Sequence, residues 1–219
     1  MVSYSIQLTI VTGLNLTMNG LEEEGINVIS PVVLTLSNLT ALNLSYNFIT
    51  HRNATAIQQI AKICGKLTKL RKLDLTGNYI RSGVCTILRH LQSPLTHLAL
   101  GGCGARDCDL REMCAMDTVQ TLQSLKLDSS GFVNCIELLC TFVLKSAATL
   151  EYLSLEDNMF DLSSVPLLCQ MVSQLPSLKS LSLCYNHLSS DDMRTFTKEF
   201  PALHLVDRDW FPLEEDMQD

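Results

Sequence analysis

Three cysteines stand close together in the segment GGCGARDCDLREMC, at Cys103, Cys108 and Cys114, shortly after His90 and His97. Thiolates and imidazoles are the ligands that zinc prefers, and structural zinc sites usually show tight pairs such as C-x2-C. Here four and five residues separate the cysteines. The spacing therefore favours thiols that pack in the interior, and we predict neither a metal site nor a bound cofactor.

No arrangement typical of nucleophilic catalysis stands out, because the five histidines are scattered along the chain. The GGCG segment at 101–104 lacks the Lys-Ser/Thr pair of a phosphate-binding loop. Arg52, Arg81 and Arg106 all follow expected strands at loop positions, and GTPase-activating proteins use such an arginine. GTPase activation is therefore an alternative, whereas the sequence favours a non-enzymatic protein without catalytic residues.

A repeated unit must position these side chains. The pattern L-x-x-L-x-L-x-x-N/C-x-L recurs, for example in LTALNLSYNFI at 39–49 and LRKLDLTGNYI at 70–80. Seven units begin near residues 11, 39, 70, 95, 122, 150 and 178. A chance match would not recur in phase, so the pattern indicates leucine-rich repeats, each with one strand and a helical segment.

The segments between the expected strands show helical spacing of apolar residues, as in Ile57, Ile60, Ala61 and Cys64. Each unit exposes a leucine face that only stacking can bury. We therefore predict an α/β fold: a leucine-rich repeat solenoid in a right-handed horseshoe arc, with a parallel sheet on the concave face and helices on the convex face. Residues 1–219 are expected to form a single domain that resembles the ribonuclease-inhibitor-like subclass.

The two ends of the chain differ from the repeats. Residues 1–10 alternate apolar and polar, which predicts a strand that caps the first unit or follows earlier repeats of a longer protein. We favour the longer protein. Residues 202–219 are expected to form a closing strand and an acidic tail, with Trp210 covering the last leucine layer.

Composition narrows the possible partners and compartments. The net charge is -7, from 16 Lys and Arg against 23 Asp and Glu, which argues against nucleic-acid binding. No apolar run reaches the roughly 18 residues of a membrane span. Nine cysteines scattered through apolar stretches favour a reducing compartment, the cytoplasm or the nucleus.

The concave face is the expected binding surface, because the x positions of each strand point out of the core. Carboxylates gather there in the C-terminal half, flanked by the aromatic side chains that interfaces favour. Such a surface would select a basic segment of a protein partner. The candidate binding residues are Tyr46, Asp74, Lys126, Asp128, Tyr152, Glu156, Asp157, Tyr185 and Trp210.

Four stretches together resemble the C-terminal leucine-rich half of the PRAME (melanoma antigen) family: LQSPLTHLALGGC at 91–103, LQSLKL at 122–127, SAATLEYL at 146–153 and SQLPSLKSLSLCYN at 173–186. The resemblance covers about 90–200 and extends more weakly to the first 90 residues. It implies that the arc is the substrate-recognition part of a cullin-RING ubiquitin ligase receptor, which has no catalytic residue of its own.

The resemblance also implies elongin B/C and a cullin as partners. The family contacts them through an N-terminal elongin-binding box and a neighbouring segment, and no stretch of this chain fits the box pattern. We therefore expect ligase attachment through residues absent from this chain. The alternative binding role is that of a ribonuclease-inhibitor-type adaptor or inhibitor, which binds and occludes its partner.

Overall fold

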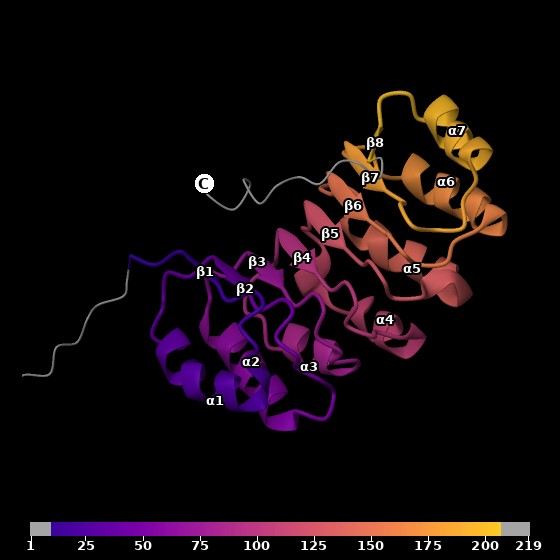
Figure 1. The fold of residues 1–219 in the computed structure, drawn as a ribbon. Coiled ribbons are helices and arrows are strands. Elements are labelled where there is room, and N and C mark those ends of the chain that lie inside the picture. The colour runs from indigo at the N-terminus through magenta and orange to yellow at the C-terminus, as the bar shows by residue number, and fades with distance from the viewer. Residues whose placement is uncertain (1–9, 207–219) are drawn as a thin grey trace, which may run out of the picture.

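The computed structural model describes residues 10–206; most of the predicted strand at 1–10, and Trp210 with the acidic tail, lie outside that range. Eight short strands form one parallel sheet in chain order (Figure 1). The strands are β1 (Gly13–Asn15), β2 (Ala41–Asn43), β3 (Lys72–Asp74), β4 (His97–Ala99), β5 (Ser124–Lys126), β6 (Tyr152–Ser154), β7 (Ser180–Ser182) and β8 (His204–Val206).

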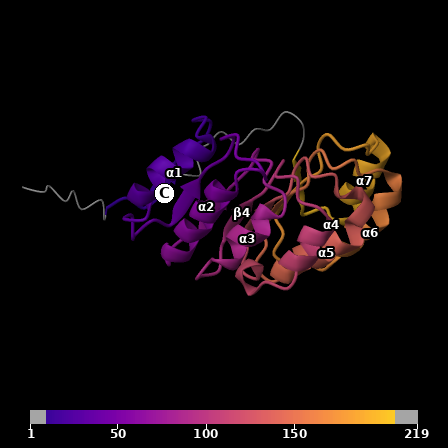
Figure 2. The same ribbon diagram turned by 90° about the horizontal axis from the view of Figure 1, so that it is seen from below.

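Helical segments connect the strands along the outer side of the arc, as both ribbon views show (Figures 1 and 2). The α-helices are α1 (Glu22–Val33), α2 (Ala54–Lys66), α3 (Gly83–Arg89), α4 (Asp107–Met113), α5 (Ile136–Val143), α6 (Val165–Ser173) and α7 (Ser190–Glu199). Four 3₁₀ segments accompany them: η1 (Asp117–Val119), η2 (Phe132–Cys135), η3 (Leu144–Ser146) and η4 (Leu162–Ser164). The predicted α/β solenoid, with strands inside and helices outside, is confirmed.

Leucine spacing sets the register of the sheet. The middle residue of every strand is a leucine that pairs with the middle leucine of the next, as Leu42 does with Leu73 and Leu125 with Leu153. These leucines are buried in the six inner strands. The helices contribute fully buried residues such as Ile60 and Leu168 to the same core. One continuous layer of side chains therefore joins all the units.

An asparagine at the ninth position of the repeat fastens a unit to the one before it. The amide oxygen of Asn78 accepts hydrogen bonds from the backbone N–H of Asn47 (3.0 Å) and Ile49 (3.1 Å). Its amide nitrogen donates to the carbonyls of Leu44 (2.8 Å) and Leu75 (3.0 Å). The buried Asn47 and Asn158 and the half-buried Asn186 form equivalent bonds, so a column of amides runs beside the leucine core.

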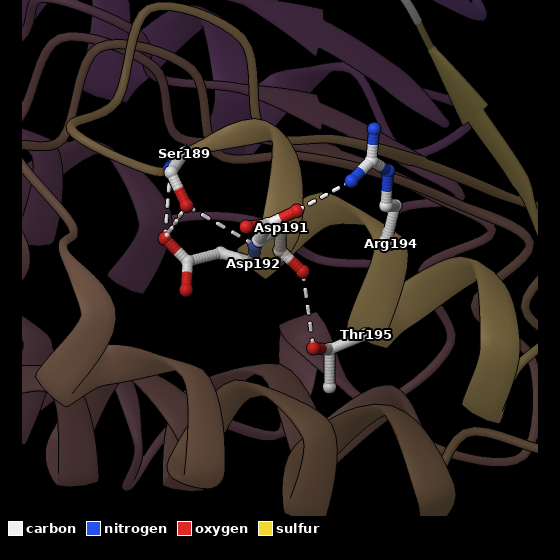
Figure 3. A network of polar contacts seen from close by, with 5 residues as sticks. All are labelled: Ser189, Asp191, Asp192, Arg194 and Thr195. Carbon is white, nitrogen blue, oxygen red and sulfur yellow. Dashed lines mark hydrogen bonds and ion pairs between the residues drawn. The ribbon is translucent and has the colours of Figure 1, made fainter.

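The last helix, α7, begins with a reciprocal cap (Figure 3). The Ser189 hydroxyl accepts a hydrogen bond from the Asp192 N–H (3.2 Å), and the Asp192 carboxylate accepts one from the Ser189 N–H (2.8 Å). One turn on, the Thr195 hydroxyl donates to the Asp191 carbonyl (3.2 Å), and Arg194 pairs with the Asp191 carboxylate at 2.5 Å. The cap satisfies N–H groups that the first turn leaves free.

We expect Ser189→Ala to lower the free energy of unfolding by about 1 kcal/mol, the usual cost of removing a serine N-cap. Arg194→Ala should cost less, because its ion pair is exposed to solvent on both sides. Urea unfolding of both variants measures the difference. Equal losses would show that the cap adds nothing beyond an ordinary surface contact.

Candidate functional site

The concave face carries two rows of strand side chains, one on each side of the central leucines. Sheet register places Lys72 beside His97, His97 beside Ser124, and Ser124 beside Tyr152 in the first row. The second row places Lys126 of β5 beside Ser154 of β6. Charged, aromatic and hydroxyl groups thus share the middle of the arc.

Lys126 and Tyr152, both predicted binding residues, are in contact across this face. The Lys126 ammonium nitrogen lies 5.7 Å from the centroid of the Tyr152 ring, within the range of a cation–π interaction. Tyr152 is half-buried, and its burial, followed by the charges of Asp128 and Glu156, raises the pKa of its phenol. The tyrosine is therefore a neutral group whose ring lies among charges of both signs.

The predicted carboxylates form a ladder with hydroxyl groups one repeat away. The Asp128 carboxylate accepts hydrogen bonds from the Ser154 hydroxyl (2.6 Å) and the Glu156 N–H (3.0 Å). Glu156 accepts a bond from the Ser182 hydroxyl in the same way. Burial raises the pKa of the Asp128 carboxyl although the Ser154 bond opposes it. These bonds fix the carboxylates in place and occupy part of their acceptor capacity.

The fourth unit adds a group that the sequence analysis did not select. His97 is half-buried, and burial, followed by the charges of Lys72 and Lys126, lowers its pKa, so the imidazole is neutral at pH 7. The positive charge at the centre of the concave face therefore comes from Lys72 and Lys126, next to the carboxylate ladder. The sequence contains the information that groups these residues, because Lys72, His97 and Lys126 occupy x positions of three successive units.

The other predicted binding residues lie apart from this cluster. Tyr46 and Tyr185 occupy the eighth position of the second and seventh units, where both have positive φ and exposed rings. Asp157 stands at the same position of the sixth unit, where its carboxylate accepts a hydrogen bond from the Ser129 hydroxyl (2.9 Å). Asp74 accepts a bond from the Thr76 N–H (2.8 Å). Trp210 lies outside the described residues.

A second surface lies at the edge of the sheet, and we call it the rim: the segments between each strand and the following helical segment. Because the strands are parallel, these segments all emerge at the same edge. Tyr79, which is 47% exposed, packs on Gly104, where an added Cβ would lie 2.4 Å from the ring. The Arg81 guanidinium carbon lies 4.8 Å from the centroid of the same ring. Tyr46 packs on Gly77 in the same manner.

Of the cysteines and arginines singled out for chemistry, Cys103, Arg81 and Arg106 make contacts within the fold. Cys103 is buried, its thiol donates to the Leu75 carbonyl (3.2 Å), and burial raises its pKa to about 12. Cys108 is exposed. Within residues 10–206, no three His, Cys, Asp or Glu side chains form a metal-binding group. Arg81 is held against Tyr79, and the Arg106 guanidinium lies 3.7 Å from Asp109.

None of the helices within residues 10–206 has both the length and the hydropathy that a membrane crossing needs.

Residues 13–214 match the family model described as the PRAME C-terminal domain. Leucine-rich repeat-containing protein 14 of Xenopus laevis is 28% identical over 208 residues, which are 90% of this chain and 40% of that protein. Preferentially expressed antigen in melanoma-like protein 7 of Mus musculus is 26% identical over 188 residues, 83% of this chain and 39% of that protein. The chain thus spans about 40% of the length of these curated relatives.

Among solved structures, a protein from Bacteroides fragilis superposes with a TM-score of 0.63 and 14% sequence identity. The match covers 95% of this chain and 68% of that chain. At this level of identity the likeness concerns the fold alone.

Proposed function

Because the chain belongs to the family of PRAME C-terminal domains, we propose that it is a non-enzymatic protein-interaction module whose concave face binds a protein partner. Its role, on this proposal, is substrate recognition for a cullin-RING ubiquitin ligase. The observation that supports it best is the cluster of Lys126, Asp128, Tyr152 and Glu156, which we call the β5–β6 patch.

The β5–β6 patch has the properties of a binding hot spot. Tyr152 offers a large ring with its polar end among charges, and tyrosine is enriched among residues that dominate interface energies. The hydroxyl ladder holds the carboxylates of Asp128 and Glu156 before any partner arrives. Little side-chain freedom remains to be lost on binding, so more of the contact energy is retained.

The charges around the patch indicate the chemistry of the partner segment. Glu156 and the exposed Asp157 suit a basic side chain at the edge of the concave face. Lys72 and Lys126, on either side of neutral His97, suit a carboxylate nearer its centre. We therefore propose a partner segment that presents basic residues to the acidic side of the patch and an acidic residue to the lysines.

Attachment to elongin B/C and a cullin is proposed for residues outside this chain, since the relatives are more than twice as long as the span it matches. A cytoplasmic or nuclear setting is part of the same proposal. It is supported by the nine free cysteines, all within the described range, because reducing compartments keep thiols unpaired. Burial raises the pKa of Cys64 to about 12, which makes that thiol unreactive.

We expect the double variant Tyr152→Ala/Glu156→Lys to lose its partner in affinity capture followed by mass spectrometry. The expected loss is at least about thirtyfold, because an interface hot spot contributes about 2 kcal/mol or more and about 1.4 kcal/mol is tenfold. The double variant Val28→Ala/Glu24→Lys is the matched control, because both residues are exposed on α1, outside the concave face. Circular dichroism melting of each variant shows whether the fold is kept. If the double variant still captures the partner, the binding site lies outside the β5–β6 patch.

The same capture distinguishes the two binding roles. Elongin B/C and cullin subunits recovered from cells with the captured partner, together with ubiquitin on that partner, support the ligase role. A partner that is bound without these subunits and without ubiquitin supports the occluding adaptor or inhibitor instead.

A further inference from the structure

The rim reverses its charge along its length. The three segments that follow β2, β3 and β4 contain arginines and no carboxylates, whereas the two that follow β5 and β6 contain carboxylates and neither lysine nor arginine. The residues concerned are Arg52, Arg81 and Arg106 in the first half. In the second half they are the exposed Asp157 and Asp161, since Asp128 and Glu156 are held in the β5–β6 patch. A single edge of the sheet therefore has a basic half and an acidic half.

Each half of the rim also exposes large apolar side chains. Phe48 is 69% exposed and Tyr79 47% exposed in the basic half. Met159 is 55% exposed, and Leu162, the first residue of η4, is 69% exposed beside the acidic half. Exposed apolar groups gathered along one edge, with charges among them, are typical of a surface that binds another protein.

The boundary between the two halves is hollow. A cavity of about 680 Å³ begins there, at Arg106 and Ser130, and extends between α4 and the helical segments η2 and α5. The glycines Gly102 and Gly131 leave no side chain on either side of this boundary. A second polypeptide can therefore approach the backbone closely at the point where the charge changes sign.

We propose that the rim is a docking surface for a second copy of this chain, related to the first by a twofold axis at this boundary. A twofold interface brings the same patch of both copies together, so the patch must be complementary to itself. The rim meets that condition, because rotation places the basic half of one copy against the acidic half of the other. The segment after β3, with Tyr79 and Arg81, then faces the segment after β6, with Asp157 and Met159.

The small size and exposed charges of the surface indicate a weak dimer. Five neighbouring units at a strand spacing of about 4.8 Å extend over about 20 Å of the sheet edge. This length is short for a protein interface, since specific, stable complexes bury about 1,200–2,000 Å². We therefore expect a weak dimer whose formation depends on protein concentration and is reduced by salt, since its charge pairs are exposed.

Sedimentation equilibrium of the full chain over a range of concentrations tests the proposal. Arg81→Glu and Asp157→Lys should each raise the dimer dissociation constant about tenfold or more. Each change places a like charge opposite the unchanged partner residue, and the twofold axis repeats this repulsion at a second place in the interface. An equimolar mixture of the two variants should restore the dimer, because every changed charge then meets its opposite. Asp161 is left unchanged, because its carboxylate accepts a hydrogen bond from the Ser163 N–H (3.0 Å) and caps η4.

Lys62→Glu is the matched control, since Lys62 is an exposed cation on α2, away from the rim. It should dimerise like the unchanged chain, as should Tyr152→Ala, which separates this proposal from binding at the concave face. Thermal melting of every variant confirms that it is folded. A chain that remains monomeric up to its solubility limit, or a mixture of variants that fails to restore the dimer, would overturn the proposal.

Discussion

Replacement of Asn78 by alanine lowers the free energy of unfolding by about 3–5 kcal/mol, because it leaves several buried backbone groups without partners. The Asn78 side chain is fully buried and makes hydrogen bonds with the backbone of two units. It accepts from two N–H groups and donates to the carbonyls of Leu44 and Leu75. These groups are buried, so each lost bond costs more than at the surface.

The chain itself supplies the control for this prediction. Cys103 occupies the same ninth position in the next unit, where its thiol donates one bond to the Leu75 carbonyl. Asn78→Cys should therefore keep one of the four bonds and unfold at a urea concentration between those of the wild type and Asn78→Ala. The midpoints of urea unfolding measure the order. If the two variants unfold at the same midpoint, the inter-unit hydrogen bonds are not what Asn78 contributes.

The fold could be predicted from the sequence because every repeat imposes the same pairing. A leucine at the middle of each strand must meet the leucines of its neighbours, and a shift of one residue would turn it out of the core. The parallel order and the register follow directly from that condition. The role of the ninth residue follows too, since a side chain at a fixed place in each unit meets the same backbone groups in every turn.

The candidate site could be predicted only in part, because its geometry depends on pairs of residues from different units. Asp128 is fixed by Ser154, and Glu156 by Ser182, each about one repeat further along the chain. A scan of single positions identifies the carboxylates and misses the hydroxyls that hold them. Such a scan also groups Tyr46 with Tyr152, although three repeat units lie between the units that contain them.

The rim cannot be recognised from single sequence positions, for a related reason. Tyr79 and Gly104 hold the same position in successive units, and the ring of one packs on the backbone of the other. Aligning the units by position, rather than listing exposed residues along the chain, would have shown this pair. The same alignment shows Arg81 and Arg106 directly after the last leucine-type position of their units, and Asp161 in that place two units later.

We expect Leu153→Ala to lower the free energy of unfolding by about 2–5 kcal/mol, the range for a buried leucine whose removal leaves a cavity. Leu153 is fully buried, and Leu125 and Leu181 pack on it from the neighbouring strands. Both neighbours are themselves fixed by pairing, so the cavity cannot close by a simple shift of one side. Leu14→Ala should cost less, because Leu14 lies in the terminal strand β1 and is only half-buried.

The position of Leu153 in a stack of units adds a second expected effect. Each unit contacts only its neighbours, so weakening one interface in the stack separates the units on either side energetically. Urea unfolding of Leu153→Ala should therefore show a broader transition with a smaller slope than that of Leu14→Ala. Leu153→Met, which conserves volume, should keep both the stability and the slope near those of the wild type. A small loss of stability in Leu153→Ala would place this leucine outside the core and remove the basis for a rigid concave face.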